Sequence, residues 1–96
     1  MALILPYEGK SPNIAGSAWL APTAVVTGDA AIGEDSSIWF GAVLRGDVHW
    51  IRVGRSVNIQ DNAVCHVTND DAPLEIEDFV SIGHAAVVHG CTLKRG

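Results

Sequence analysis

The chain repeats itself every six residues, and this period constrains its fold more than any other feature. From residue 14 onward a bulky apolar residue returns at every sixth position, in the series Ile14, Leu20, Val26, Ile32, Ile38 and Leu44. The fourth residue after each is small or β-branched: Ala18, Ala24, Ala30, Ser36, Ala42 and Val48. Because side chains alternate across a strand, a spacing of six keeps every bulky residue on one side. Such a strict period is typical of a solenoid, whereas an ordinary β-sandwich does not require it.

The repeat then shifts phase twice and resumes. The second series is Val53, Ile59 and Cys65, and the third is Ile76, Ile82 and Val88. The first shift adds three residues and predicts a loop near 47–52, and the second adds five and predicts a loop near 66–75. Three hexapeptides complete a coil of eighteen residues, so residues 14–96 predict about four to five coils after a lead-in at 1–13. We therefore expect one all-β domain over residues 1–96, a parallel β-helix without a C-terminal helix.

Composition agrees with strands and excludes several functions. Val and Ile number nineteen, and β-branched residues favour strands over helices. The net charge of −5, without a basic cluster, argues against nucleic acid as a partner. No apolar run approaches the ~20 residues that a membrane helix needs, so no membrane partner is expected. The first residues lack the basic flank of a signal peptide, and two cysteines make no disulfide framework, which favours the cytoplasm.

Stacking the coils gathers polar residues into columns. Arg45, His66 and His89 each directly follow a bulky residue, and their repeats lie three hexapeptides apart. We therefore expect these three side chains in one column on successive coils. His66 and His89 would be stacked neighbours, close enough to share one metal ion through nitrogen bonds of ~2.0–2.1 Å.

His84 falls in a different column, one side of the prism earlier, together with Asp61. It cannot easily reach the His66 and His89 pair of its own chain, but it can reach that pair on a neighbour around a three-fold axis. Three histidines with a fourth position open are typical of catalytic zinc. The alternative is that these are ordinary hydrogen-bonded surface or core histidines. His49 has no column partner and is interpreted as a loop residue.

Five segments carry a resemblance to a known family. They are Trp39–Asp47, Val57–Asn62, Cys65–Val67, Gly83–His84 and His89–Cys91. Together they resemble the γ-class carbonic anhydrase family of the hexapeptide-repeat superfamily, over almost the whole chain. The resemblance implies a left-handed parallel β-helix that assembles as a homotrimer. It also implies a metal between subunits, usually zinc with iron or cobalt as alternatives, which His66 and His89 of one chain and His84 of the next hold.

The same resemblance assigns roles to five further residues. Arg45 and Asp47 match a pair that makes ion contacts between subunits and lines the site. Gln60 matches the side chain that orients the metal-bound water or bicarbonate, Asp61 a second ion-pair carboxylate, and Asn58 a polar residue near the pocket. For Arg45, Asp47 and Asp61 a purely structural role in the trimer is an equal alternative, because a charge in a subunit interface must be paired.

Two departures from the family pattern bear on activity. Where the prototype branch places proton-transferring acids, this chain has Val48 and Asn69, and Asp70 and Asp71 stand only nearby. We therefore predict weak or absent turnover. Family members also continue for several more coils and a helix, whereas this sequence stops at Lys94-Arg95-Gly96. We expect either a fragment or a partner that covers the open end.

The leading hypothesis is therefore a lyase of the carbonic anhydrase type, which hydrates carbon dioxide reversibly with a metal-bound hydroxide. One alternative is a hexapeptide acyltransferase or a thioesterase that acts on coenzyme A thioesters. Another is a non-catalytic trimeric scaffold. Cys65 and Cys91 are interpreted as small core residues and not as nucleophiles.

Overall fold

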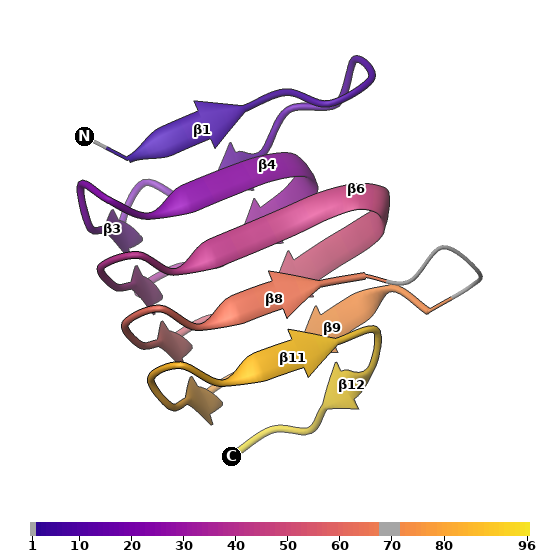
Figure 1. Ribbon diagram of the computed structural model, residues 1–96. Coiled ribbons are helices and arrows are strands. Elements are labelled where there is room, and N and C mark those ends of the chain that lie inside the picture. The colour runs from indigo at the N-terminus through magenta and orange to yellow at the C-terminus, as the bar shows by residue number, and fades with distance from the viewer. Residues whose placement is uncertain (1, 68–71) are drawn as a thin grey trace.

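The computed structural model describes residues 2–67 and 72–96, and its strands form three parallel ladders around one interior (Figure 1). The first ladder stacks β1 (Leu3–Leu5), the first half of β4 (Val25–Ile32), the first half of β6 (Val43–Val53), β8 (Val64–His66) and β11 (Val87–His89). The second stacks β2 (Asn13–Ile14), the second halves of β4 and β6, β9 (Leu74–Ile76) and β12 (Thr92–Leu93). The third stacks β3 (Trp19–Leu20), β5 (Ser37–Ile38), β7 (Asn58–Ile59) and β10 (Ser81–Ile82).

The coils wind left-handed. In Figure 1 each front strand runs from left to right, the chain returns behind it, and each coil lies below the previous one. All pairings between named strands are parallel in the described ranges, and these ranges contain no helix. The predicted fold class, an all-β left-handed parallel β-helix, is confirmed. No helix in residues 2–67 and 72–96 is long and apolar enough to cross a membrane.

The six-residue period fills the interior as predicted. The bulky residues of the middle coils are fully buried, among them Val26, Ile38, Leu44 and Ile59, and so are the small residues Ala24, Ala42 and Ala63. Small residues beside bulky ones let flat coils stack closely. Val48 departs from this pattern, because its side chain is 47% exposed. The reason is that the chain leaves the six-residue register at that point.

The first phase shift is a bulge inside a strand. Gly46 pairs with Gly28 and Ile51 pairs with Ala30, so residues 47–50 stand opposite Asp29 alone. The three added residues were predicted correctly in number, but the predicted loop near 47–52 was wrong, because β6 continues through it. A bulge absorbs added residues while the strand keeps its pairing on both sides.

Two other boundaries differ from the prediction or fall partly outside the description. The lead-in at 1–13 already belongs to the solenoid in part, because β1 pairs with β4 from Leu3 to Leu5. Of the loop predicted near 66–75, His66 belongs to β8 and Leu74 and Glu75 to β9. Residues 68–71, which include Asn69, Asp70 and Asp71, lie outside the described residues.

Two corners of the prism repeat a residue with positive φ from coil to coil. Asp35, Ser56 and Phe79 have positive φ at one corner, and Gly41, Asn62 and Ala85 have positive φ at another, which precedes the first ladder. Glycine suits position 41, because it has a φ of 72° and an added Cβ would displace the Asn62 side chain. We call this second turn the Phe40–His84 corner, after the residues that stand at its tip.

Candidate metal centre

His66 and His89 lie side by side on the outer face of the first ladder. The register pairs Arg45 with His66 and His66 with His89, which confirms the predicted column. The histidines point outward because Cys65, the residue before His66, is fully buried and side chains alternate along a strand. The two imidazole rings have centroids 5.1 Å apart. The two rings are thus close enough for one nitrogen of each to bind the same metal ion.

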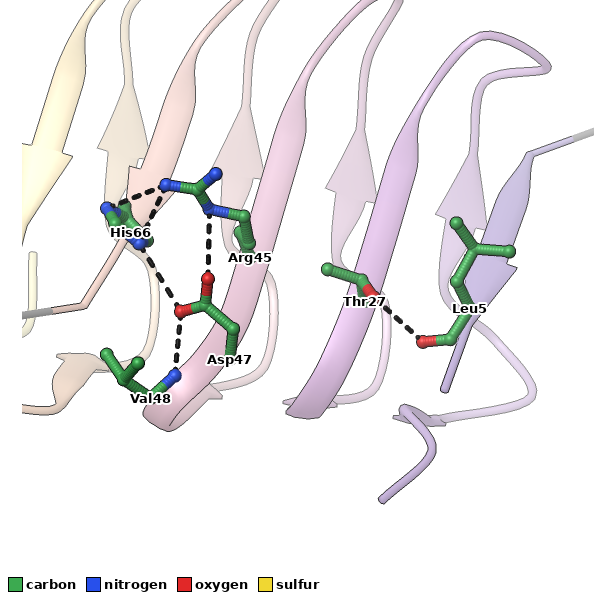
Figure 2. Close-up of polar contacts among 6 residues, drawn as sticks. All are labelled: Leu5, Thr27, Arg45, Asp47, Val48 and His66. Carbon is green, nitrogen blue, oxygen red and sulfur yellow. Dashed lines mark hydrogen bonds and ion pairs between the residues drawn. The ribbon is translucent and has the colours of Figure 1, made fainter. Parts of the chain in front are cut away.

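Arg45 and Asp47 hold the His66 ring in place (Figure 2). Arg45 Nη2 lies 2.9 Å from His66 Nε2 and 3.3 Å from Nδ1. Asp47 Oδ2 lies 3.3 Å from Arg45 Nε, and Asp47 Oδ1 lies 3.3 Å from His66 Nε2. A guanidinium only donates hydrogen bonds, so Arg45 can bond only to whichever His66 nitrogen the tautomer leaves with a lone pair. A metal ion needs that same lone pair, so this contact and metal binding by His66 exclude each other.

Asp47 is kept ionised by its neighbours. Burial by itself would raise the pKa of this carboxyl, but the hydrogen bond from the Val48 N–H at 2.7 Å and the charges of His66 and Arg45 outweigh it. The net result is a pKa of Asp47 below its ordinary value of 3.8. Asp47 therefore acts as a fixed negative charge beside the histidine pair.

His84 lies at the Phe40–His84 corner, apart from the other two histidines. Ser81 and Ile82 of β10 pair with Asn58 and Ile59 of β7, and the Ala85 N–H donates to the Asp61 carbonyl oxygen at 2.8 Å. This confirms that His84 and Asp61 share a column. An open groove of about 500 Å³ runs along the corner, lined by Trp39, Asn58, Gln60, Asp61, Asn62, His84 and Ala85.

Asn58 carries an unsatisfied group beside this groove. Its Oδ1 is buried and has no hydrogen-bond partner among the described residues. A buried acceptor without a donor costs about 1–3 kcal/mol, so the position favours an added donor such as the O–H of a bound water or bicarbonate. Sequence reasoning placed Asn58 near a pocket, but its unpaired oxygen is visible only in the structure.

The eight predicted site residues thus form two groups. Arg45, Asp47, His66 and His89 share the outer face of the first ladder, while Asn58, Gln60, Asp61 and His84 line the corner groove. Residues 2–67 and 72–96 hold no cluster of three or more His, Cys, Asp or Glu able to bind a metal within one chain. The two-imidazole pair nevertheless fits zinc, which accepts nitrogen ligands, if a third donor comes from elsewhere.

Two features escaped the sequence prediction. Trp19, Trp39 and Phe40 form one cluster, with ring centroids 4.8 to 6.2 Å apart. The spacing of eighteen residues per coil already indicates this cluster, because it pairs Trp19 with Ser37, which lies two residues before Trp39. His49, expected in a loop, lies in the β6 bulge and lines a second open groove with Tyr7 and Asp47.

The cysteines also differ from one another. Burial raises the pKa of the Cys65 thiol to about 12, which agrees with a core residue that does not act as a nucleophile. Cys91 is exposed, so its assignment to the core was wrong. The register explains this, because Cys91 comes two residues after His89 and falls in the turn between β11 and β12.

Comparison with known proteins identifies the family. No family model matches the chain. A carbonic anhydrase of Geobacillus kaustophilus is 46% identical over 93 residues, which make up 97% of this chain and 50% of that protein. The mitochondrial gamma carbonic anhydrase 3 of Arabidopsis thaliana is 49% identical over 90 residues, covering 88% of this chain and 35% of that protein. Over the residues it spans, this chain belongs to the γ-class carbonic anhydrase family of hexapeptide-repeat proteins.

A solved structure supports the hexapeptide-repeat fold. A hexapeptide transferase family protein from Anaplasma phagocytophilum superposes with a TM-score of 0.89 at 46% identity, over 94% of this chain and 52% of that one. The chain therefore spans about half the length, or less, of these γ-class relatives and of this structure.

Proposed function

We propose that three copies of this chain assemble around a three-fold axis and bind one zinc ion at each boundary. His66 and His89 of one copy and His84 of the next supply the three nitrogen ligands, and iron or cobalt would fit the same donors. The observation that carries the proposal is the outward-facing imidazole pair, with rings 5.1 Å apart, whose third donor lies at another corner of the same solenoid. The similarity to gamma carbonic anhydrases supports it.

The proposed reaction is the reversible hydration of carbon dioxide. When bound, zinc supplies a water acidified to a pKa of about 7, which makes a nucleophile available at neutral pH. Gln60 and Asn58 line the groove beside His84 and orient the water and bicarbonate through their carboxamides. The unpaired Asn58 Oδ1 is an acceptor for the bicarbonate O–H. Asp47, held ionised, keeps a negative charge beside His66.

Arg45 has to leave His66 before zinc binds, because both need the same lone pair. In the assembly, the proposed new partner of Arg45 is the Asp61 carboxylate of the neighbouring copy. This pairing agrees with the intersubunit ion contacts that the family resemblance implies. Arg45 would then align the two subunits in the zinc-loaded trimer, and it would contact the His66 imidazole in the free chain. The compartment expected from the sequence, the cytoplasm, stays a prediction.

Complementation between two variants tests whether the site is shared. His66→Ala and His84→Ala are each expected to lose zinc and carbon dioxide hydration. When both chains are co-expressed, every mixed trimer contains one boundary with His84 from the first variant and His66 and His89 from the second. About a quarter of the wild-type zinc content and activity should return at equal amounts. Mixed trimers that hold no zinc would contradict a shared site.

An acyl-transferring or thioester-cleaving enzyme is the second candidate, because a similar solved structure is named a hexapeptide transferase family protein. This function predicts turnover of acetyl-coenzyme A by the zinc-free chain. The proposed lyase predicts no such turnover, and His66→Ala would leave a transferase signal unchanged. A trimer that binds zinc and turns over neither substrate would instead indicate a scaffold.

A further inference from the structure

The Phe40–His84 corner presents three exposed side chains in a vertical row. The Asn62 N–H donates to the Phe40 carbonyl oxygen at 2.9 Å, and the Ala85 N–H donates to the Asp61 carbonyl oxygen at 2.8 Å. These matching bonds place Phe40, Asp61 and His84 at equivalent positions on successive coils. All three are exposed, Phe40 to 46%. The row therefore reads aromatic, acidic and basic, one residue per coil.

Phe40 is backed by two tryptophans. Its ring centroid lies 6.0 Å from that of Trp19 and 6.2 Å from that of Trp39, in edge-on orientations. Trp39 is fixed in turn by its Nε1–H, which donates to Ser37 Oγ at 3.1 Å. We call Trp19, Trp39 and Phe40 the aromatic corner. A rigid group of large rings left open to solvent is typical of a protein contact surface.

The outer face of the first ladder carries a matching row. The register stacks Thr27, Arg45, His66 and His89 on successive coils. Thr27 Oγ1 donates to the Leu5 carbonyl oxygen at 3.0 Å, so its polar group is already satisfied (Figure 2). Along this second row, a threonine whose hydroxyl is already hydrogen-bonded is followed by a basic arginine and then by two histidines. Successive residues of this row are separated by the same strand spacing as those of the corner, about 4.8 Å.

We propose that the aromatic corner docks on the first ladder of a second copy of this chain and sets the height at which the copies meet. If His84 reaches both His66 and His89 of the neighbour, then Asp61, one coil earlier, lies between the levels of the neighbour's Arg45 and His66. Phe40, one coil earlier again, lies between the levels of the neighbour's Thr27 and Arg45. This inference rests on the proposed trimer, and the aromatic corner is the contact that aligns its subunits.

The chemistry of the two rows favours a second copy over any other partner. Each level pairs compatible groups: ring with satisfied threonine, carboxylate with guanidinium, and imidazole with imidazoles. A shift by one coil would place Asp61 against two histidines and leave Arg45 facing Phe40 alone. Aromatic anchors supply most binding energy at an interface, while charge pairs at its edge supply alignment. Phe40 therefore controls affinity, and Asp61 controls register.

Sedimentation of the metal-free protein over a dilution series tests the affinity. Phe40→Ser should raise the concentration at which trimers dissociate by at least roughly ten-fold. The matched control is Phe79→Ser, because Phe79 is similarly exposed at 42% but lies at the other corner beside Arg55 and Arg95. This control should stay as trimeric as the wild type. An unchanged Phe40→Ser trimer, or equal dissociation of the control, would overturn the inference.

A cross-link tests the contact without weakening the assembly. In a Cys91→Ser background, Phe40→Cys with Thr27→Cys should form disulfide-linked chains on mild oxidation, whereas Phe79→Cys with Thr27→Cys should not. Absence of the first cross-link in a trimeric sample would contradict the proposed height. The outcomes distinguish the two proposals: a wild-type trimer that takes up no zinc when zinc is supplied, yet dissociates on Phe40→Ser, refutes the metal centre alone. A zinc-loaded trimer that is indifferent to Phe40→Ser refutes only the docking contact.

Discussion

The two halves of the candidate centre are built on different kinds of backbone. The first-ladder half stands on regular strands, where His66 contacts both Arg45 and Asp47. The corner half stands on turns with positive φ, where His84 is exposed beside an open groove. The first half is ordered by its own chain, while the second offers a donor that no described neighbour fixes. A site divided in this way is ordered on one side and is completed only by assembly.

Removing a histidine from either half should abolish zinc binding but have different effects on the single chain. His66→Ala and His84→Ala should each weaken zinc binding by more than the roughly 10–100-fold typical of losing a ligand's supporting residue, because each removes a ligand itself. Only His66→Ala should also alter the free energy of unfolding of the zinc-free chain, since it breaks the contacts with Arg45 and Asp47. Zinc titration and urea unfolding measure the two effects, and equal destabilisation by both variants would contradict the comparison.

Gly41→Ala tests the backbone of the corner half. The φ of 72° and the collision of a new Cβ with Asn62 should cost about 1–3 kcal/mol of unfolding free energy. Thermal and urea unfolding measure the loss. Gly16→Ala is the matched control, because an added Cβ there meets nothing within 4 Å and its φ is not in the left-handed range. If both changes have the same effect, the corner does not depend on this geometry.

Asp47→Asn tests the electrostatic order of the first-ladder half. The pKa of the folded carboxyl is lowered below 3.8, so the ionised form contributes stability that is complete at neutral pH. That contribution should be lost as the pH falls through the folded pKa. Since the Arg45 partner is half exposed, the variant should cost at most about 1 kcal/mol at pH 7 in the zinc-free chain. Urea unfolding should show this difference shrinking toward pH 3; a constant difference would point to packing instead of charge.

Ala85→Gly should give the smallest effect, in the opposite direction. Ala85 has a φ of 60° at the position that Gly41 occupies two coils earlier at the same corner, and glycine adopts this conformation without a steric penalty. We expect a gain of about 0.5–1 kcal/mol, reduced by the added freedom of the unfolded chain. Differential scanning calorimetry should show a raised Tm, while Ala63→Gly in the buried column should lower it.

Column membership was predictable because it depends only on counting. Once three hexapeptides make a coil, the residues eighteen positions apart must stack, and the two phase shifts add three and five to that number. The stacking of Arg45, His66 and His89 follows, as does the separation of His84. The course of the chain at residues 47–50 was not predictable, because added residues can leave the sheet as a loop or stay in it as a bulge.

The sequence by itself determined the architecture and the division of the histidines into two columns, since both follow from the period of the backbone repeat. Only the tertiary structure decided what each side chain meets: Arg45 on the lone pair of His66, the unpaired oxygen of Asn58, and the joining of Trp19 to Trp39 and Phe40. The physical reason is that a repeat fixes the height and face of a residue, whereas its contacts depend on rotamers and on neighbours from other coils.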